Sequence, residues 1–199
     1  QSKENLFENE GMTRSAIMGV YSELAGTYVY GQKMSVNWQG VSDIEQAKKF
    51  INECHKRNIR VIIDLPSCGA YDLFLTHPEL FIKDSRQCST DWTDVRLLNT
   101  GTNKRLNQDV LDAHKRFVNL VLELGADGIR ADVATIKPSA FWVEIIKYTR
   151  AKDPEFLFLA EASDSWREPP SIYAQFTPYD KLLQAGFDGY YGSFFNLKD

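Results

Sequence analysis

The sequence lacks the features that would direct it to a membrane or to a nucleic acid. No apolar run approaches the roughly 20 residues that a transmembrane helix requires. Basic residues are not in excess either, because the formal net charge is −4 and the isoelectric point is near 5.5. A nucleic-acid-binding domain would carry a basic footprint. We therefore expect no membrane and no nucleic acid among the partners of this chain.

Cysteine is also scarce. The chain has three cysteines, Cys54, Cys68 and Cys88, without the spacing of a metal site, which is typical of free thiols rather than of a disulfide framework. Free thiols favour a reducing cytoplasm. The sequence starts at Gln1 without an initiator Met and without an apolar signal core, which indicates that the natural beginning lies upstream. A signal peptide removed from that region stays an open alternative to a cytoplasmic location.

What the sequence does contain is a repeated alternation of short apolar runs and amphipathic segments. Apolar residues at helical spacing predict helices over 42–54, 110–122, 138–152 and 179–185. Gly125 is a plausible stop for the second of these helices. Apolar runs without strict alternation predict buried strands over 59–64, 127–132, 156–161 and 186–191. This order predicts an α/β fold with a parallel sheet covered by helices.

The alternation extends over one part of the chain. Residues 1–40, interrupted by glycines, form a poorly assigned N-terminal segment with a hint of one strand at 27–30. Residues 41–199 form the expected α/β unit. Within it, residues 65–106 are rich in Pro, Asp, Ser and Thr and are too long for an ordinary loop between a strand and a helix. We expect an active-site excursion or a small subdomain there.

Two carboxylates end neighbouring apolar runs. Asp132 ends one run and Glu161 ends the next, 29 positions later, which fits one strand, one crossover helix and a second parallel strand. Adjacent strands lie about 4.8 Å apart, so both carboxylates would emerge at the same end of the sheet. A pair about 5 Å apart is what a retaining glycosidase uses as nucleophile and acid/base. This spacing predicts a carbohydrate-active enzyme.

The residues beside these carboxylates support the same chemistry. Arg130 lies two positions before Asp132 and so faces the same side of a strand, where its charge favours the ionised form of a nucleophile. Glu161 ends a very apolar run, and partial desolvation raises the pKa of a proton donor. Both acids could instead be structural residues at strand ends. A doubly wound sheet also fits the alternation, but no glycine-rich phosphate loop follows the first clear strand. Carboxylates at successive strand ends favour a (β/α)8 TIM barrel.

Four segments carry a resemblance to a known family. Residues 125–134 (GADGIRADVA) resemble the nucleophile motif of the α-amylase family, glycoside hydrolase family 13, whose form is close to GxDGFRxDxA. Residues 158–161 (FLAE) resemble its acid/base segment, residues 61–64 (VIID) its first region, and residues 92–99 (WTDVRLLN) its WxDVxxLN stretch. The likeness runs from about residue 43 to residue 191. It implies a (β/α)8 barrel that acts on α-linked glucans or maltooligosaccharides.

Carried over by position, the resemblance implies that Asp132 is the nucleophile, Glu161 the general acid/base and Arg130 the partner of the nucleophile. It also places Lys137 near an acceptor site for the substrate. Asp64 ends the first clear strand, where barrel residues usually belong to the site. Loop aromatics can stack on sugar rings, although most serve packing. The substrate-binding candidates are therefore Asp64, Tyr71, Trp166 and Lys137.

The sequence departs from the family pattern in its first region and at its end. Cys68 and Gly69 stand where the family has an Asn, often a calcium ligand, and a His that contacts the sugar. We therefore expect no metal and no other cofactor. No third carboxylate motif follows before Asp199, and a barrel of this type takes about 250 residues. We expect only part of the barrel in this chain, with the remainder supplied by a longer protein or by a second copy in a homo-oligomer.

The sequence thus predicts a retaining glycoside hydrolase or transglycosidase working by double displacement, with Asp132, Glu161 and Arg130 as the catalytic residues. The choice between hydrolysis and transfer stays open. The alternative is a non-catalytic amylase-like barrel that binds carbohydrate or a protein partner, which the two replaced first-region residues motivate.

Overall fold

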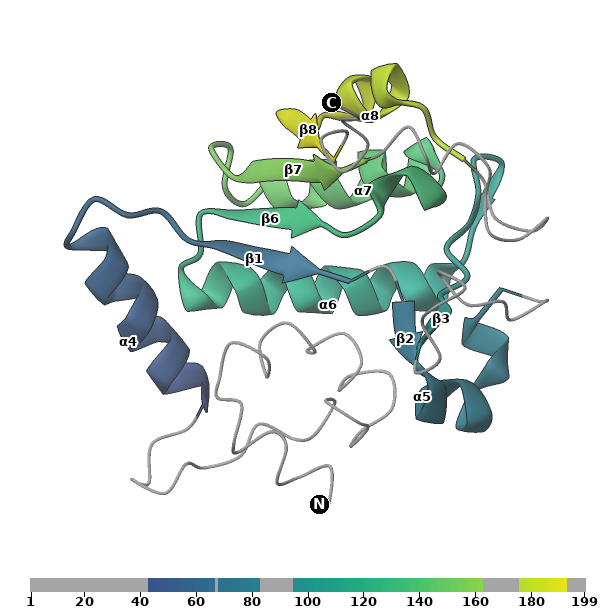
Figure 1. The fold of residues 1–199 in the computed structure, drawn as a ribbon, viewed down its shortest axis with the longest axis horizontal. Coiled ribbons are helices and arrows are strands. Elements are labelled where there is room, and N and C mark those ends of the chain that lie inside the picture. Colours follow the sequence, from purple (N-terminus) through teal and green to yellow (C-terminus); the bar gives the residue numbers. More distant parts are fainter. Residues whose placement is uncertain (1–42, 67, 83–94, 163–175, 193–199) are drawn as a thin grey trace, which may run out of the picture.

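The computed structural model describes residues 43–66, 68–82, 95–162 and 176–192 (Figure 1). The principal helices are α4 (Asp43–His55), α6 (Gln108–Leu124), α7 (Ser139–Arg150) and α8 (Tyr179–Ala185). They alternate with four strands, β1 (Ile62–Leu65), β6 (Gly128–Ala131), β7 (Leu157–Glu161) and β8 (Gly189–Tyr191). The predicted strand at 27–30 lies outside the described residues.

These four strands form one parallel sheet. Its order is β1-β6-β7-β8, the same as their order in the chain, without a reversal. The register pairs Asp64 with Arg130 and Arg130 with Leu159, and it pairs Glu161 with Tyr191. Because right-handed crossovers in one direction keep the helices on one face, this order fits a segment of a barrel better than a doubly wound sheet.

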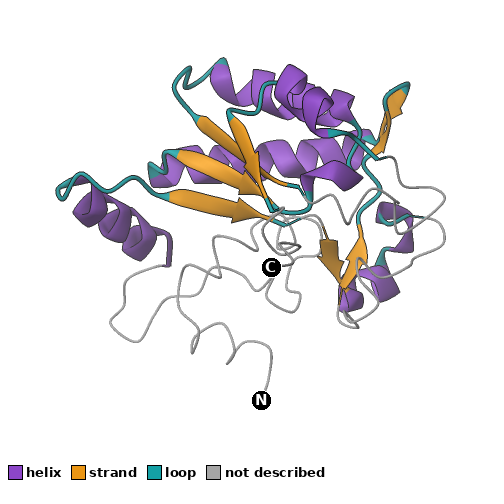
Figure 2. Cartoon of the chain, turned by 45° about the horizontal axis from the view of Figure 1, so that its top comes forward, coloured by secondary structure: helices purple, strands orange, loops and turns teal. Residues whose placement is uncertain are grey.

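The two faces of the sheet differ in burial. Side chains that point toward the helices are buried, with Leu65, Ile129, Phe158 and Ala160 all at 0% exposure. Residues of the other face, such as Asp64 and Arg130, are only half-buried. Figure 2 shows α6 and α7 on the same side of the strands. The helix-facing side therefore holds the core, and the half-open side holds the polar residues.

Local sequence signals explain the ends of α6. The side chain of Asn107 accepts a hydrogen bond from the backbone N–H of Val110, which satisfies one of the unpaired donors of the first turn. Gly125 ends the helix in the left-handed conformation at φ 82°, where a residue without a Cβ is least strained. The predicted stop at Gly125 is thereby confirmed.

The aromatic side chains behind the sheet form one continuous packing chain. Phe141 and Trp142 of α7 meet at 5.2 Å between ring centroids, and Trp142 meets Phe187 at 5.1 Å. Phe187 in turn meets Phe158 of β7 edge to face at 6.1 Å. Trp142 also donates its indole N–H to the carbonyl of Ala134 at 2.9 Å. This core holds α7 against β7, the strand that carries Glu161.

The connection from β1 to α6 contains structure of its own. Two strands, β2 (Cys68–Ala70) and β3 (Val95–Leu97), form an antiparallel ribbon. A short helix α5 (Tyr71–Thr76) and a 3-10 turn η1 (Pro78–Leu80) follow β2. A small hairpin, β4 (Gly101–Thr102) with β5 (Arg105–Leu106), precedes α6. The carbonyl oxygen of the Asn103 side chain accepts the backbone N–H of Ala140 at 2.9 Å and so links this hairpin to the start of α7.

The predicted α/β class with a parallel sheet is confirmed. The described strands form an open sheet of four rather than a closed barrel. The first strand starts at Ile62 rather than at the predicted residue 59, because Ile59 is 52% exposed and lies before the sheet. Within the described ranges, no helix combines the length and the apolar content needed to cross a membrane.

The prediction of free thiols is wrong for Cys68. Its sulfur is disulfide-bonded, whereas Cys54 is a free thiol in α4. The sequence could not reveal this bond, because pairing depends on where the fold brings two sulfurs together. The cytoplasmic location therefore stays a prediction without the support of the cysteine argument.

Candidate active site

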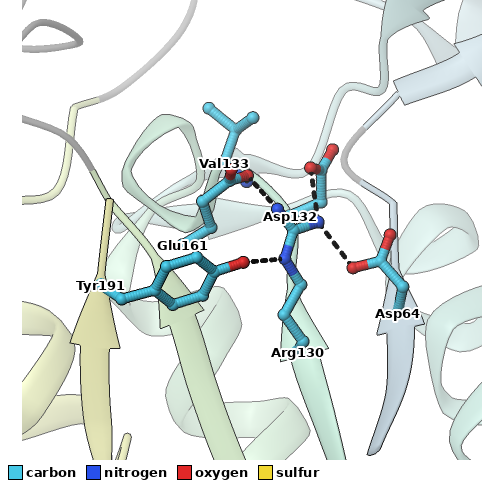
Figure 3. A network of polar contacts seen from close by, with 6 residues as sticks. All are labelled: Asp64, Arg130, Asp132, Val133, Glu161 and Tyr191. Carbon is cyan, nitrogen blue, oxygen red and sulfur yellow. Dashed lines mark hydrogen bonds and ion pairs between the residues drawn. The ribbon is translucent and has the colours of Figure 1, made fainter. Parts of the chain in front are cut away.

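Four polar side chains converge beyond the carboxyl ends of three neighbouring strands (Figure 3). Asp64 comes from β1, Arg130 from β6 and Glu161 from the last position of β7. Asp132 follows β6 directly, and its backbone N–H still pairs with the carbonyl of Leu65 at 3.0 Å. The parallel register is what brings these four side chains to one end of the sheet.

Arg130 is the centre of this cluster. Its Nη1 donates to Oδ1 of Asp64 at 2.6 Å and to Oδ1 of Asp132 at 2.8 Å. Its Nη2 lies 2.6 Å from Oε2 of Glu161, and its Nε donates to the hydroxyl of Tyr191 at 2.6 Å. All three nitrogens of the guanidinium are thus engaged, with partners on all four strands of the sheet or directly after them.

The backbone after Asp132 turns sharply. Val133 has φ 41° and ψ 52°, a left-handed conformation that is strained for a β-branched residue. This turn directs the backbone N–H of Val133 to Oε2 of Glu161 at 3.1 Å. Val133 is held there by a small buried cluster, which consists of Cys68, Ile82, Leu97, Val133 and Ile136. Packing of the β2–β3 ribbon therefore supports the position of the acid.

Asp64 of β1 and Glu161 at the end of β7 are both shifted toward their neutral forms. Burial raises the pKa of Glu161, and a side-chain hydrogen bond with Asp132 raises it further, against the opposing effects of the Val133 N–H and Arg130. Burial also raises the pKa of Asp64, against a hydrogen bond from Arg130 that lowers it. Burial alone would lower the pKa of Arg130, but hydrogen bonds with Asp64 and Tyr191 outweigh it, so its pKa is raised. A charged guanidinium thus faces an acid inclined to hold a proton.

The structure brings together four of the predicted site residues, Asp64, Arg130, Asp132 and Glu161. Tyr71 begins α5, where its backbone is described but its side chain is not, and Trp166 lies outside the described residues. Their predicted contacts with a sugar stay predictions.

Lys137 differs from the other candidates in its surroundings. Its side chain is 1% exposed, and Nζ lies 5.5 Å from the ring centroid of Phe141 in α7. Burial lowers the pKa of Lys137 to about 7, although the charge of Asp132 opposes this shift. The 3-10 turn η2 (Ala134–Ile136) after Val133 leads the chain into the core. The contact between Lys137 and substrate stays a prediction.

Sequence reasoning missed Tyr191 and Val133. Tyr191 lies at the end of the last predicted strand, so the strand-end rule that selected Asp64 would also have selected it. Val133 contributes a backbone N–H through a left-handed turn, and no pattern of side chains in the sequence predicts such a contact. Tyr191 contacts Arg130, and Val133 contacts Glu161.

The first-region departures have a structural explanation. A Cβ atom on Gly69 would lie 2.7 Å from the ring of Phe81 and 3.2 Å from the side chain of Leu98, so this position has no room for a histidine. The sulfur of Cys68 is in a disulfide and offers no oxygen ligand. The residues present at these positions thus do not fit the calcium site that the resemblance implies. The described residues also hold no group of three or more His, Cys, Asp or Glu side chains suited to a metal ion.

Comparisons with known proteins show similar folds and one similar sequence. The fold is similar to an α-amylase from Lactobacillus plantarum, with a TM-score of 0.60 and 27% identity over 82% of this chain and 38% of that protein. It is also similar to the maltogenic α-amylase AmyB from Thermotoga neapolitana, with a TM-score of 0.54 and 24% identity over 74% of this chain and 31% of that protein. Among curated proteins, neopullulanase 2 of Thermoactinomyces vulgaris is 23% identical over 60% of this chain. No family model matches the sequence.

The chain spans 23% of the length of that neopullulanase and less than half of either amylase. The resemblance to the α-amylase family that the sequence predicts is confirmed, and the chain corresponds to part of such enzymes.

Proposed function

We propose that the protein is a retaining glycoside hydrolase or transglycosidase that acts on α-linked glucans or maltooligosaccharides. One observation carries this proposal. A single guanidinium, that of Arg130, binds Asp132 and Glu161 at the same end of two adjacent parallel strands. The similarity to α-amylases and to a neopullulanase supports the substrate class.

In the first step, a carboxylate oxygen of Asp132 attacks the anomeric carbon of the sugar while Glu161 gives its proton to the departing glycosidic oxygen. The bond to the leaving sugar breaks as the bond to Asp132 forms. In the second step, Glu161 takes a proton from water or from an acceptor sugar, and that oxygen displaces Asp132. The product keeps the configuration of the substrate at the anomeric carbon.

The environments of the two acids fit these separate roles. Asp132 faces Nη1 of Arg130 at 2.8 Å, which stabilises a charged nucleophile. The pKa of Glu161 is raised by burial and by Asp132, which favours the protonated form needed to assist the leaving group. A carboxylate beside a guanidinium and a second carboxyl that is inclined to keep its proton are the expected pattern for a nucleophile and an acid.

We also infer that the four parallel strands are consecutive strands of a (β/α)8 barrel. The unreversed strand order and the single helical layer support this inference. The remaining strands would come from a longer chain or from a second copy. In such a barrel Asp64, Tyr71 and Trp166 would lie at the end where substrate binds.

Covalent trapping tests the proposed function. The full-length protein is incubated with a fluorinated α-glucosyl donor that forms but slowly releases the glycosyl-enzyme, and the labelled peptide is identified by mass spectrometry. We expect the label on Asp132 and no label in an Asp132→Asn variant. Asp109→Asn, which changes an exposed acid in the first turn of α6, serves as the matched control and should label as the wild type does. A label on another residue would overturn the assignment.

A second candidate function rests on Gly69 and Cys68. Neither residue offers the sugar-contacting side chain of the family, and the space at Gly69 is filled by Phe81. This favours a non-catalytic amylase-like barrel that binds carbohydrate or a protein partner. Equal turnover of maltooligosaccharides, at zero or at background level, in the wild type and in Asp132→Asn would support this alternative.

A further inference from the structure

We propose that Tyr191 is a positioning residue that sets the orientation of the Arg130 guanidinium and, through it, the contact between Arg130 and Glu161. This inference rests on the proposed function, because it gives Glu161 the role of acid/base. Figure 3 shows the phenol of Tyr191 on the side of Arg130 opposite to Asp64.

The guanidinium of Arg130 is a rigid planar group whose donors keep fixed directions relative to one another. Nη1 is held by Asp64 and Asp132, and Nη2 faces Glu161. The two acids fix the position of Nη1, but the plane of the guanidinium could still rotate about that nitrogen. The 2.6 Å bond from Nε to the Tyr191 hydroxyl adds the second fixed point. With both ends of the plane held, Nη2 can take only one direction toward Glu161.

The position of Tyr191 is itself well determined. It pairs in register with Glu161, so the two side chains rise next to each other from adjacent strands. Its carbonyl accepts the backbone N–H of Ala162 at 2.7 Å. Gly192 follows at φ 131°, and a Cβ there would lie 2.6 Å from the carbonyl oxygen of Ala162, so the strand end is closely packed. The backbone that carries the phenol is therefore fixed by contacts that do not involve Arg130.

The orientation of Arg130 matters because it acts on an acid that must change its charge during the reaction. Among the described residues, the charged and titratable groups around Glu161 are Arg130 and Asp132 from β6 and its end, Tyr191 from β8, and Asp64 from β1 through Arg130. Of these, only Arg130 favours the ionised form of Glu161. A guanidinium that turns away would leave Glu161 protonated too long for the second step.

Tyr191→Phe removes one hydroxyl and keeps the ring, so it tests the hydrogen bond alone. Tyr190→Phe is the matched control, because the adjacent tyrosine faces the other side of the sheet and stacks on Tyr179 at 4.7 Å. In the full-length protein we expect kcat on maltooligosaccharides to fall about tenfold in Tyr191→Phe, the factor of one hydrogen bond to a charged group, with KM nearly unchanged. The alkaline limb of the pH–rate profile should move to higher pH, because Arg130 then favours ionised Glu161 less. Tyr190→Phe should change neither.

A second measurement does not depend on activity. The carboxyl of Glu161 is titrated by ¹³C NMR, with its signal assigned by its loss in Glu161→Gln. A higher pKa in Tyr191→Phe than in the wild type supports the inference, and an unchanged pKa overturns it. Failure of the proposed function shows differently, as wild-type turnover in Asp132→Asn. The NMR titration decides the role of Tyr191 in either case.

Discussion

Replacement of Lys137 by methionine should stabilise the protein at neutral pH. Lys137 is 1% exposed, next to the ring of Phe141, and burial lowers its pKa from 10.5 to about 7. Methionine has a similar length and no charge, so it keeps the packing and removes the need to bury an ammonium group. The gain follows from the pKa itself, because a pKa that differs between the folded and unfolded states is a contribution to folding free energy.

The size and sign of the effect depend on pH. Below pH 7 the amine is protonated in both states, so the folded protein bears the full cost of burial, about 5 kcal/mol at about 1.4 kcal/mol per pH unit. Between pH 7 and pH 10.5 the unfolded chain binds a proton that the folded protein does not, so the stability of the wild type rises with pH. We therefore expect Lys137→Met to raise the free energy of unfolding by up to about 4 kcal/mol at pH 7. At pH 9 the increase should be smaller by about 2 kcal/mol.

Urea unfolding of the full-length protein at pH 7 and pH 9 measures both values. Lys147→Met is the control, because Lys147 is exposed on the adjacent helix α7 and its replacement should change stability by no more than about 0.5 kcal/mol at either pH. A Lys137→Met variant that is less stable than the wild type, by the same amount at both pH values, would refute the reasoning. It would mean that the contacts of the buried ammonium outweigh the cost of its burial.

Three further changes probe other parts of the argument. Arg130→Lys keeps the charge but cannot bind Asp64 and Glu161 at once, so kcat/KM should fall at least about 100-fold with little change in melting temperature, as measured by steady-state kinetics and calorimetry. Gly69→Ala places a Cβ 2.7 Å from Phe81 and should lower stability by about 1 to 3 kcal/mol in urea, while an unchanged midpoint would contradict the packing. Asn103→Ala removes the acceptor at the start of α7 and should cost about 1 kcal/mol, whereas Lys104→Ala in the same turn should cost nothing measurable.

The sequence was most informative where one residue type has one structural use. Gly125 predicted a helix end because a left-handed residue is favoured there, and the structure has φ 82° at that position. Asp132 and Glu161 could be placed at one end of a sheet from their spacing alone, because a strand, a helix and a parallel strand leave few alternatives. The position of Arg130 on the same side as Asp132 followed from the two-residue period of a strand. These inferences needed only local geometry and the handedness of crossovers.

The sequence was less informative where a residue's place depends on contacts between distant segments. Lys137 was placed near an acceptor site by counting from Asp132, and that count does not show that the left-handed Val133 and the turn after it lead the chain into the core. Cys68 was predicted to be a free thiol, and this was wrong because pairing of sulfurs depends on tertiary structure. Tyr191 could have been selected as a residue at a strand end, but its contact with Arg130 depends on a register with Glu161 that no local pattern contains.

The balance of charge in the cluster connects the fold to the proposed chemistry. Three carboxylates, those of Asp64, Asp132 and Glu161, surround one guanidinium in a half-buried place. If all three were ionised, like charges would repel across short distances in a medium that screens them less than water does. A proton retained on one of the three acids relieves this repulsion. We expect this proton on the acid that is most buried and that shares a hydrogen bond with another carboxyl. Glu161 is that acid, since its side chain is 12% exposed against 19% for Asp132 and 34% for Asp64. The same crowding of acids that would destabilise a purely structural cluster therefore prepares one member to donate a proton and leaves Asp132, on Nη1 of Arg130, ready to attack.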